Sequence, residues 1–551
     1  MKKHIIDTLY TLLFALAAYI VLLTQSDYLY AVEENNLFVG SHTFMSELLC
    51  QKGGLWAWIG CFLTQFFHYP WLGALILVLV WTATYCLLVD AFRLKGNCRL
   101  LAWIPICALL VSVTDIGYWL YYIKMPGYWF SQSVSSFAAV LITWVLGKLV
   151  GLFYKGNLSW MLFILAYFAV GQRFPEFQKN DYENTLLQLP FIIAFVAVVL
   201  LPLSKYVTIP VKTKWKPELL TAIALVSFFC CSYFLSYRNY NFHAELRMMR
   251  AIDHCQWDEV IDEAKKAEQP TNLMVLYKNI ALMQQGRLTE MFKINNCGTQ
   301  PHTGDSLKVF IAHMDASMIY YQFGQINYAY RWAMENSVER GYKVKYLKMF
   351  VRCAIMNHEF ELAAKYLAIL NSSLFHKDWV REHQLMLRSA SKLRSSEEYR
   401  CIMPLVVDDL NYLDVDNSLP EKWLLEHFSS LKSPATSKLE DVIMCMSLWT
   451  EDAYAFCLHF YDYARRHQGE KMAELYQQGA LLYGKTQDSP INVDNFPFDD
   501  IIVQRYDNFN RDYNDLISMG LDVKTAGERL KSMYGDTYWW FYYFYTDFNV
   551  Y

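Results

Sequence analysis

The stretch IIDTLYTLLFALAAYIVLLT, residues 5–24, decides the fold, and Asp7 is its only charged residue. A run of about 20 apolar residues is long enough for a helix to cross the hydrocarbon core of a bilayer. Because Lys2 and Lys3 precede it, the segment also resembles a signal peptide. The residues that follow, QSDY, offer no small-x-small cleavage site. We therefore interpret the segment as a first transmembrane helix.

Six further apolar runs follow in the first half of the chain. They cover residues 71–88, 100–123, 134–153, 158–171, 186–203 and 219–235. Charged residues are sparse up to Tyr237 and dense afterwards, so the overall hydrophobic content of 54% averages two different halves. The sequence predicts an all-α protein with two domains. A polytopic transmembrane domain of about seven spans occupies residues 1–236, and a soluble helical domain occupies residues 237–551.

Orientation follows from the cations between the spans, because Lys and Arg in short loops stay on the cytoplasmic side. With the N-terminus inside, eleven cations lie in cytoplasmic segments and four in the opposite loops. The eleven are Lys2, Lys3, Arg93, Lys95, Arg99, Lys148, Lys155, Lys205, Lys212, Lys214 and Lys216, and the four are Lys52, Lys124, Arg173 and Lys179. Seven spans then place the C-terminal domain outside the cytoplasm.

The loop at residues 26–70 contains the passage GGLWAWIGCFLTQFFHYPWLG, residues 53–73. Gly53 and Gly54 open a helix-length apolar stretch that Pro70 interrupts, and aromatic residues crowd it. Such rings favour the membrane interface. We expect residues 55–69 to form an interfacial or re-entrant helix on the external side, ahead of the second span.

The soluble half alternates helical patterns with tight breaks. Gly324 and the pair Asn357-His358 each separate two helical segments. Phrases such as GQINYAYRWAMEN and HEFELAAKYLAIL resemble the helix turns of tetratricopeptide repeats, over roughly residues 242–370. Repeats of this kind usually hold a protein or peptide on their concave face. A plain alternative is that the helices serve as a lid or spacer on the membrane half.

Glu33 and Glu34 are the first candidate site residues, because they follow the first span in the external loop. This arrangement is similar to that of multi-pass glycosyltransferases that use polyprenyl-phosphate sugar donors, where such an acid acts as a base or holds a divalent ion. The resemblance implies a possible lipid-linked glycan as substrate. An adjacent acidic pair in a soluble loop is more often simply hydrated.

Asp115 is the third candidate, since an acid in or at the end of an apolar span is costly without a site or a partner. Its plain interpretation is a loop position just past a short span. His42, His68 and Glu47 share the external region but show no helical ligand spacing, so the sequence predicts no metal site. No P-loop, dinucleotide fingerprint, HExxH or GxSxG motif is present, and no cofactor is predicted.

The C-terminal stretch YGDTYWWFYYFYTDFNVY has 11 aromatic residues among 18. We expect these rings to cap the helical stack, in preference to membrane contact or, last, sugar stacking. The 13 cysteines are scattered and suggest no framework, although an isolated bridge such as Cys445 to Cys457 is conceivable in an exported domain.

The passage at residues 53–73, joined to seven spans and a helical-repeat tail, resembles an uncharacterised family of multi-pass inner-membrane proteins from Bacteroidota. The resemblance implies a bacterial inner membrane, and the asymmetry of the loop cations then predicts a cytoplasmic N-terminus and a periplasmic C-terminal domain. A net charge of -4 and no basic stripe argue against nucleic acid as a partner. The leading hypothesis is an envelope scaffold, anchored in the lipid bilayer, whose repeat domain binds a protein or peptide. The alternative is the lipid-linked sugar transferase.

Overall fold

The computed structural model describes twelve segments of the chain and confirms the all-α class, since every regular element in them is a helix. The described residues are 2–151, 158–170, 181–205, 217–267, 270–292, 316–406, 427–428, 431, 436–449, 451–485, 491–492 and 495–544. The chain divides into two compact units. The N-terminal unit comprises residues 1–243, 334–352 and 360–385, and the C-terminal unit comprises residues 244–333, 353–359 and 386–551. Residues 334–352 and 360–385 therefore cluster with the apolar half of the chain.

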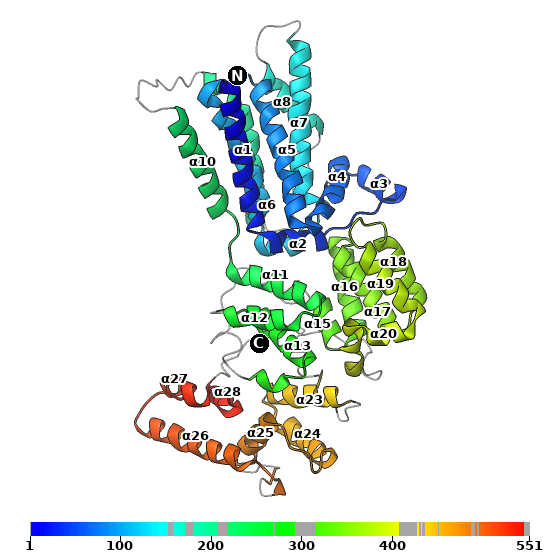
Figure 1. Cartoon of the computed structure of the whole chain (residues 1–551), viewed down its shortest axis with the longest axis vertical. Helices are drawn as coiled ribbons and strands as arrows, with labels where there is room; N and C mark the ends of the chain where they lie inside the picture. Colours follow the sequence, from blue (N-terminus) through cyan, green and yellow to red (C-terminus); the bar gives the residue numbers. More distant parts are fainter. Residues whose placement is uncertain are drawn as a thin grey trace. The chain divides into compact units, whose positions relative to one another are not determined.

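The N-terminal unit is built around a bundle of apolar helices (Figure 1). Each apolar run predicted from the sequence coincides with one of them. They are α1 (Lys2–Leu23), α5 (Pro70–Ala91), α6 (Trp103–Thr114), α7 (Tyr128–Val150), α8 (Ser159–Val170), α9 (Asp181–Leu200) and α10 (Pro217–Phe234). Helix α5 packs against α1 and α7, α6 packs against α9, and α10 packs against α1. Short 3-10 helices connect them: η2 (Gly96–Ala102), η3 (Gly117–Tyr121) and η4 (Leu201–Lys205).

Three helical segments among the described residues are long and apolar enough to cross a membrane. They are Pro70–Ala91, Gly96–Thr114 and Tyr128–Val150. A fourth arises if α1 and α2 (Ser26–Glu34), which meet at 70°, count as one broken span. Helix α8 has 12 residues and is about 18 Å long, whereas a bilayer core measures about 30 Å. The structure thus supports three or four spans, and the number seven stays a prediction.

The loop at residues 26–70 folds as its glycines and proline predicted. It contains α2, α3 (His42–Leu49), α4 (Gly54–Thr64) and η1 (Gln65–His68), and Pro70 begins α5. Gly53 adopts a φ of 72°, a left-handed conformation that favours glycine, immediately before α4. Helix α4 lies on α7 so closely that a Cβ atom on Gly60 would sit 2.4 Å from the carbonyl oxygen of Gly127.

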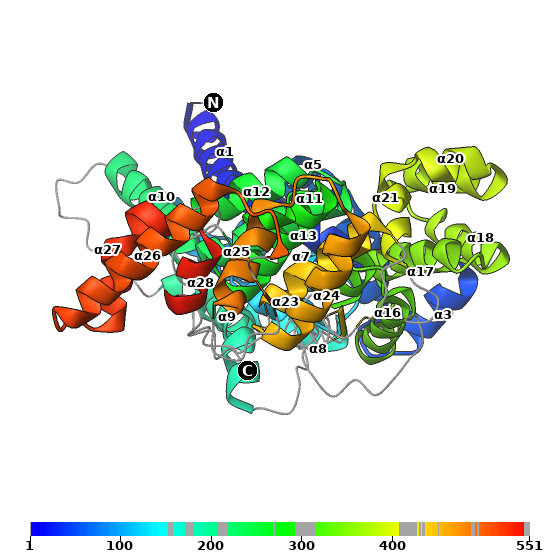
Figure 2. The same ribbon diagram turned by 90° about the horizontal axis from the view of Figure 1, so that it is seen from below.

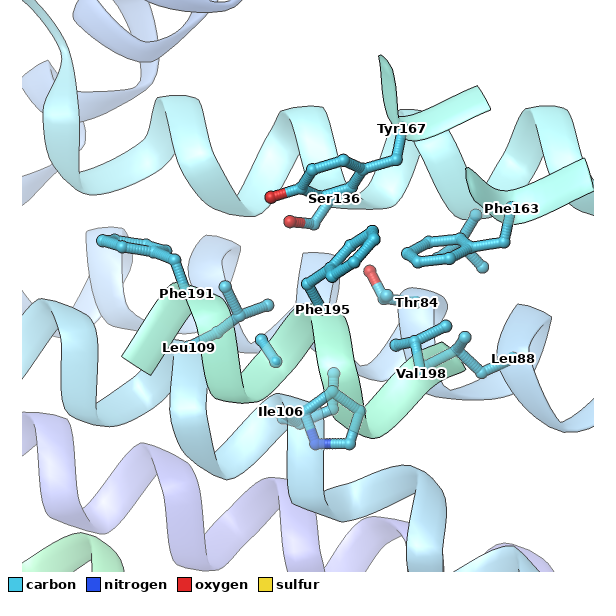
Figure 3. Close-up of a pocket in the computed structure, with 13 residues that line it drawn as sticks. Thr84, Leu88, Ile106, Leu109, Ser136, Phe163, Tyr167, Phe191, Phe195 and Val198 are labelled. Carbon is cyan, nitrogen blue, oxygen red and sulfur yellow. The ribbon is translucent and has the colours of Figure 1, made fainter. Parts of the chain in front are cut away.

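A small cavity lies within the bundle, among α5, α6, α7, α8 and α9 (Figure 3). The rings of Phe163, Tyr167, Phe191 and Phe195 line it together with aliphatic side chains. Its volume of about 30 Å³ is only slightly larger than the space that one water molecule needs. A cavity of this size is a packing space and cannot receive a sugar or a lipid tail.

Two helical hairpins occur where the sequence placed them. Gly324, with a φ of 74°, separates α15 (Ala316–Gln322) from α16 (Ile326–Arg340). His358, with a φ of 60°, separates α17 (Val344–Met356) from α18 (Phe360–Leu370), and α19 (Lys377–Arg388) follows. The helix-turn-helix pattern is confirmed, whereas the resemblance to tetratricopeptide repeats stays a prediction.

The C-terminal unit is a series of short helices in which neighbours along the chain pack together, as α23 with α24 and α26 with α27 (Figure 2). Besides α15 and the first part of α16, its described helices are α11 (Tyr240–Asp253), α12 (Trp257–Lys266), α13 (Asn272–Gln284), η5 (Leu288–Glu290), α20 (Ala390–Ser395), α21 (Glu397–Arg400), η7 (Met403–Leu405), α23 (Ser437–Trp449), α24 (Ala453–Arg466), α25 (Glu474–Gly484), α26 (Asp500–Ser518), α27 (Val523–Tyr534) and α28 (Tyr538–Phe544).

The aromatic C-terminal stretch packs into this unit. Helix α28 contacts α25 and α27 and buries Tyr538, Trp539, Trp540 and Phe541. This arrangement agrees with the predicted capping role for the residues that the structure describes, which end at Phe544. Cys445 and Cys457 are both free, so the conceivable bridge between them is absent.

Candidate functional site at the end of helix α2

Helix α2 ends in the acidic pair that the sequence singled out, and the structure buries both side chains. The Glu33 side chain is 0% exposed and points toward η1 and the segment before α19. The His376 Nε2–H donates a hydrogen bond of 2.8 Å to Glu33 Oε1. On the other side, His68 Nδ1 lies 3.6 Å from Glu33 Oε2, beyond hydrogen-bond distance. Three segments of the chain thus meet at one carboxylate.

The surroundings of Glu33 favour its charged form. Glu33 lies beyond the 70° bend between α1 and α2, near the end of the second helix. Burial by itself raises the pKa of the Glu33 carboxyl, because a charge is poorly solvated there. The contributions of His376, His68 and Lys348 together outweigh burial and lower the pKa of Glu33 below its usual value, and His376 contributes most to this lowering.

Glu34 has a different partner. Its Oε1 accepts a hydrogen bond of 2.7 Å from Lys348 Nζ, and both side chains are largely buried, at 13% and 5% exposed. Lys348 lies on α17, and its ammonium group is also 5.9 Å from the ring centre of Trp379. A buried pair of this kind holds only while both members are present, because either alone would be an uncompensated charge.

The residues that follow the acidic pair extend the same junction. Lys343 Nζ donates to Asn35 Oδ1 at 3.3 Å, and the Val344 N–H donates to the Asn36 carbonyl oxygen at 3.1 Å. Burial, together with the nearby charges of Lys345 and Arg340, lowers the pKa of Lys343 well below its usual value. The end of α2 is therefore joined to the start of α17 by main-chain and side-chain bonds.

His68 sits in an aromatic environment. The Phe375 ring stacks on its imidazole with 5.4 Å between ring centres and 5° between planes. Tyr69 contacts the edge of both rings. Nearby, Gln65 Oε1 accepts hydrogen bonds from the Ser373 hydroxyl and the Leu374 N–H, at 3.2 and 3.0 Å. These contacts fix the segment at residues 373–376 against η1.

Asp115 does not join this junction. It caps the C-terminus of α6, and its side chain is only partly exposed to solvent. It forms no ion pair with a described basic residue. Partial burial raises the pKa of its carboxyl to about 6. His42 and Glu47 lie on α3 and are also apart from the cluster of Glu33, His68 and His376.

Sequence reasoning missed the partners from the second half of the chain. His376 and Lys348 are 343 and 314 residues away from the acids that they contact. Spacing along a helix reveals ligands of one element, but it is silent about residues that only the tertiary fold brings together. The one local signal is that His376 stands between the aromatic residues Phe375 and Trp379.

The described residues thus form an all-α protein that has three or four helical segments long and apolar enough to cross a membrane and a buried cluster of Glu33, His68 and His376. The chain belongs to DUF6057, a family of unknown function, which it matches over residues 2–545. This membership agrees with the expectation of an uncharacterised family. No curated protein and no solved structure matches the chain.

Proposed function

We propose that the protein is a scaffold of the bacterial cell envelope, anchored in the inner membrane, that holds a protein or peptide partner on its helical C-terminal half. One observation carries the proposal. The end of α2 is fastened to α17 by Glu34–Lys348 and to the segment before α19 by Glu33–His376, so residues from the second half of the sequence are held within the N-terminal unit. Buried ion pairs fix orientation. Helices that offer a binding surface to a partner benefit from a fixed orientation, whereas a flexible tether functions without one.

A cavity of about 720 Å³ in the C-terminal unit supports the choice of a peptide as partner. It lies between the end of α24 and the segment before α26, and Tyr461, Tyr463, Phe496 and Phe498 supply rings to its wall. Ligand cavities are usually apolar with a few polar groups and fall in this range of volume. The basic and acidic residues at its rim, such as Lys471 and Asp499, pair with one another at 3.7 Å. Because aromatic rings and polar side chains both line the cavity, a peptide segment with both apolar and polar side chains suits it best.

The partner site can be tested with a photo-crosslinking amino acid at Phe496, which lines the cavity. Met519, 72% exposed in the same unit and outside the cavity, is the matched control position. We expect one discrete crosslinked product from Phe496 in living cells, lost when Tyr461→Asp is added, and none from Met519. Equal products at both positions, or none at Phe496 in folded protein, would reject the partner site.

The proposed topology has seven spans, the N-terminus in the cytoplasm and the C-terminal half in the periplasm. The asymmetry of eleven cations against four supports it. Alkaline phosphatase folds into an active enzyme only outside the cytoplasm, so a fusion after Tyr551 should be active and one after Lys95 inactive. An inactive fusion at Tyr551 would reject the orientation.

The lipid-linked sugar transferase gains no specific support. It requires a carboxylate that can meet an acceptor, whereas Glu33 is wholly buried and Glu34 is paired with Lys348. The scaffold is therefore the single function that we propose.

A further inference from the structure

Glu33, His68 and His376 place three metal-ligating atoms in one small space. One carboxylate oxygen and one nitrogen from each ring all lie within 4.8 Å of one another. In a tetrahedral zinc site, ligand atoms are about 2.0–2.2 Å from the ion and hence about 3.3–3.5 Å apart. His376 Nε2 lies 2.8 Å from Glu33 Oε1 and His68 Nδ1 lies 3.6 Å from Glu33 Oε2, so the two nitrogens approach different oxygens of the carboxylate at distances on either side of that separation. Small side-chain shifts would complete the geometry.

Two atoms of the cluster lack partners. Glu33 Oε2 and His68 Nδ1 are buried and form no hydrogen bond with the described residues. Buried polar atoms are nearly always satisfied, so each exception requires an explanation. These two atoms face each other across 3.6 Å, and an ion between them and His376 would satisfy both at once.

We propose that Glu33, His68 and His376 bind one divalent transition-metal ion, and that Zn²⁺ suits the site best. Two imidazoles and one carboxylate are the donors that Zn²⁺ commonly takes, whereas Mg²⁺ and Ca²⁺ prefer oxygen ligands throughout. The His68 side chain is 24% exposed although its Nδ1 atom is buried, so the cluster lies close to the protein surface. The ion links α2, η1 and the segment before α19, and so holds these three segments together within the N-terminal unit.

This inference goes beyond the scaffold function and does not depend on a partner. Full-length protein in detergent is stripped with a chelator, reloaded with Zn²⁺ or Co²⁺, and passed through a desalting column. We expect about one Zn²⁺ per chain by elemental analysis, and intense visible bands of tetrahedral Co²⁺. Zn²⁺ should also raise the thermal unfolding midpoint, since a ligand stabilises the state that binds it.

The variants His68→Ala and His376→Ala should lose stoichiometric binding and the response of the unfolding midpoint to Zn²⁺. His243→Ala is the matched control, because His243 pairs with Asp27 at 3.0 Å in the same unit but outside the cluster. It should bind like wild type. If the cluster variants fail to fold, X-ray absorption on the wild-type Zn²⁺ complex decides, and two imidazole ligands are expected. Wild-type protein that retains no ion, or a bound ion without imidazole ligands, would overturn the proposal.

Discussion

Two buried junctions in this protein show opposite ways to join helices. The junction at the end of α2 uses charged groups, with Glu34 and Lys348 in contact at 2.7 Å, and brings together segments more than 300 residues apart. The junction around α28 uses neutral rings. There the Tyr538 hydroxyl donates to the Leu448 carbonyl oxygen and pairs with the Tyr483 hydroxyl, each at 2.7 Å. Charged junctions should fail severely when one partner is removed, and neutral ones should fail gradually.

The largest effect is expected from Lys348→Ala. This change leaves Glu34 buried without its counter-ion, and the removal of one member of a buried pair costs about 3–5 kcal/mol. We expect a large drop in the thermal unfolding midpoint of the detergent-solubilised protein, or loss of folded protein, measured by fluorescence-detected size exclusion.

The matched control for this change is the double variant Glu34→Gln/Lys348→Met, which removes both charges. It should recover more than half of the lost stability, because no charge is left unpaired. If the double variant is as unstable as the sum of the two single variants, the charges are not coupled, and the two junctions do not differ as we infer.

A smaller loss is expected from Gly60→Ala, in the loop that carries the charged junction. The added Cβ atom would lie 2.4 Å from the Gly127 carbonyl oxygen, so α4 and α7 must separate, at about 1–3 kcal/mol. Gly147→Ala is the control, because that helical glycine has nothing within 4 Å, and alanine there should stabilise by up to about 1 kcal/mol. Unfolding midpoints that move in the same direction would contradict this view of the contact.

The two junctions also differ in what the sequence could predict. The many aromatic residues at the C-terminus predicted that this segment is buried against other helices. Helix α28 does pack against α25 and α27, which are close to it in the chain. Likewise, Gly53 and Pro70 marked the ends of the loop helix, because backbone conformation is a local property. Glu33 was identifiable as a candidate but His376 was not, since no local rule relates two residues across 343 positions.

Tyr538→Phe, in the neutral junction, is expected to lower the stability of the protein by no more than Gly60→Ala does. The change removes the hydroxyl that bonds Leu448 and Tyr483, and an unsatisfied buried group costs about 1–3 kcal/mol. Tyr454→Phe is the control, since that residue is 76% exposed. The unfolding midpoint should fall for Tyr538→Phe and stay unchanged for the control. An equal effect in both variants would show that the hydroxyl network contributes nothing.

The smallest effect is expected from a substitution of Asp115, an acidic residue that belongs to neither junction. Partial burial raises its pKa from 3.8 to about 6, so the folded state holds a proton that the unfolded state has lost. Between these two values the folded state binds more protons, and the stability of the protein therefore falls as the pH rises from about 4 to 6. Asp115→Asn cannot ionise. It should remove this part of the pH dependence and slightly raise the unfolding midpoint at pH 7, whereas below pH 4 wild type and variant should coincide. A variant that loses stability at pH 7 would instead show that the Asp115 carboxylate has a partner that stabilises its charge, as Lys348 does for Glu34.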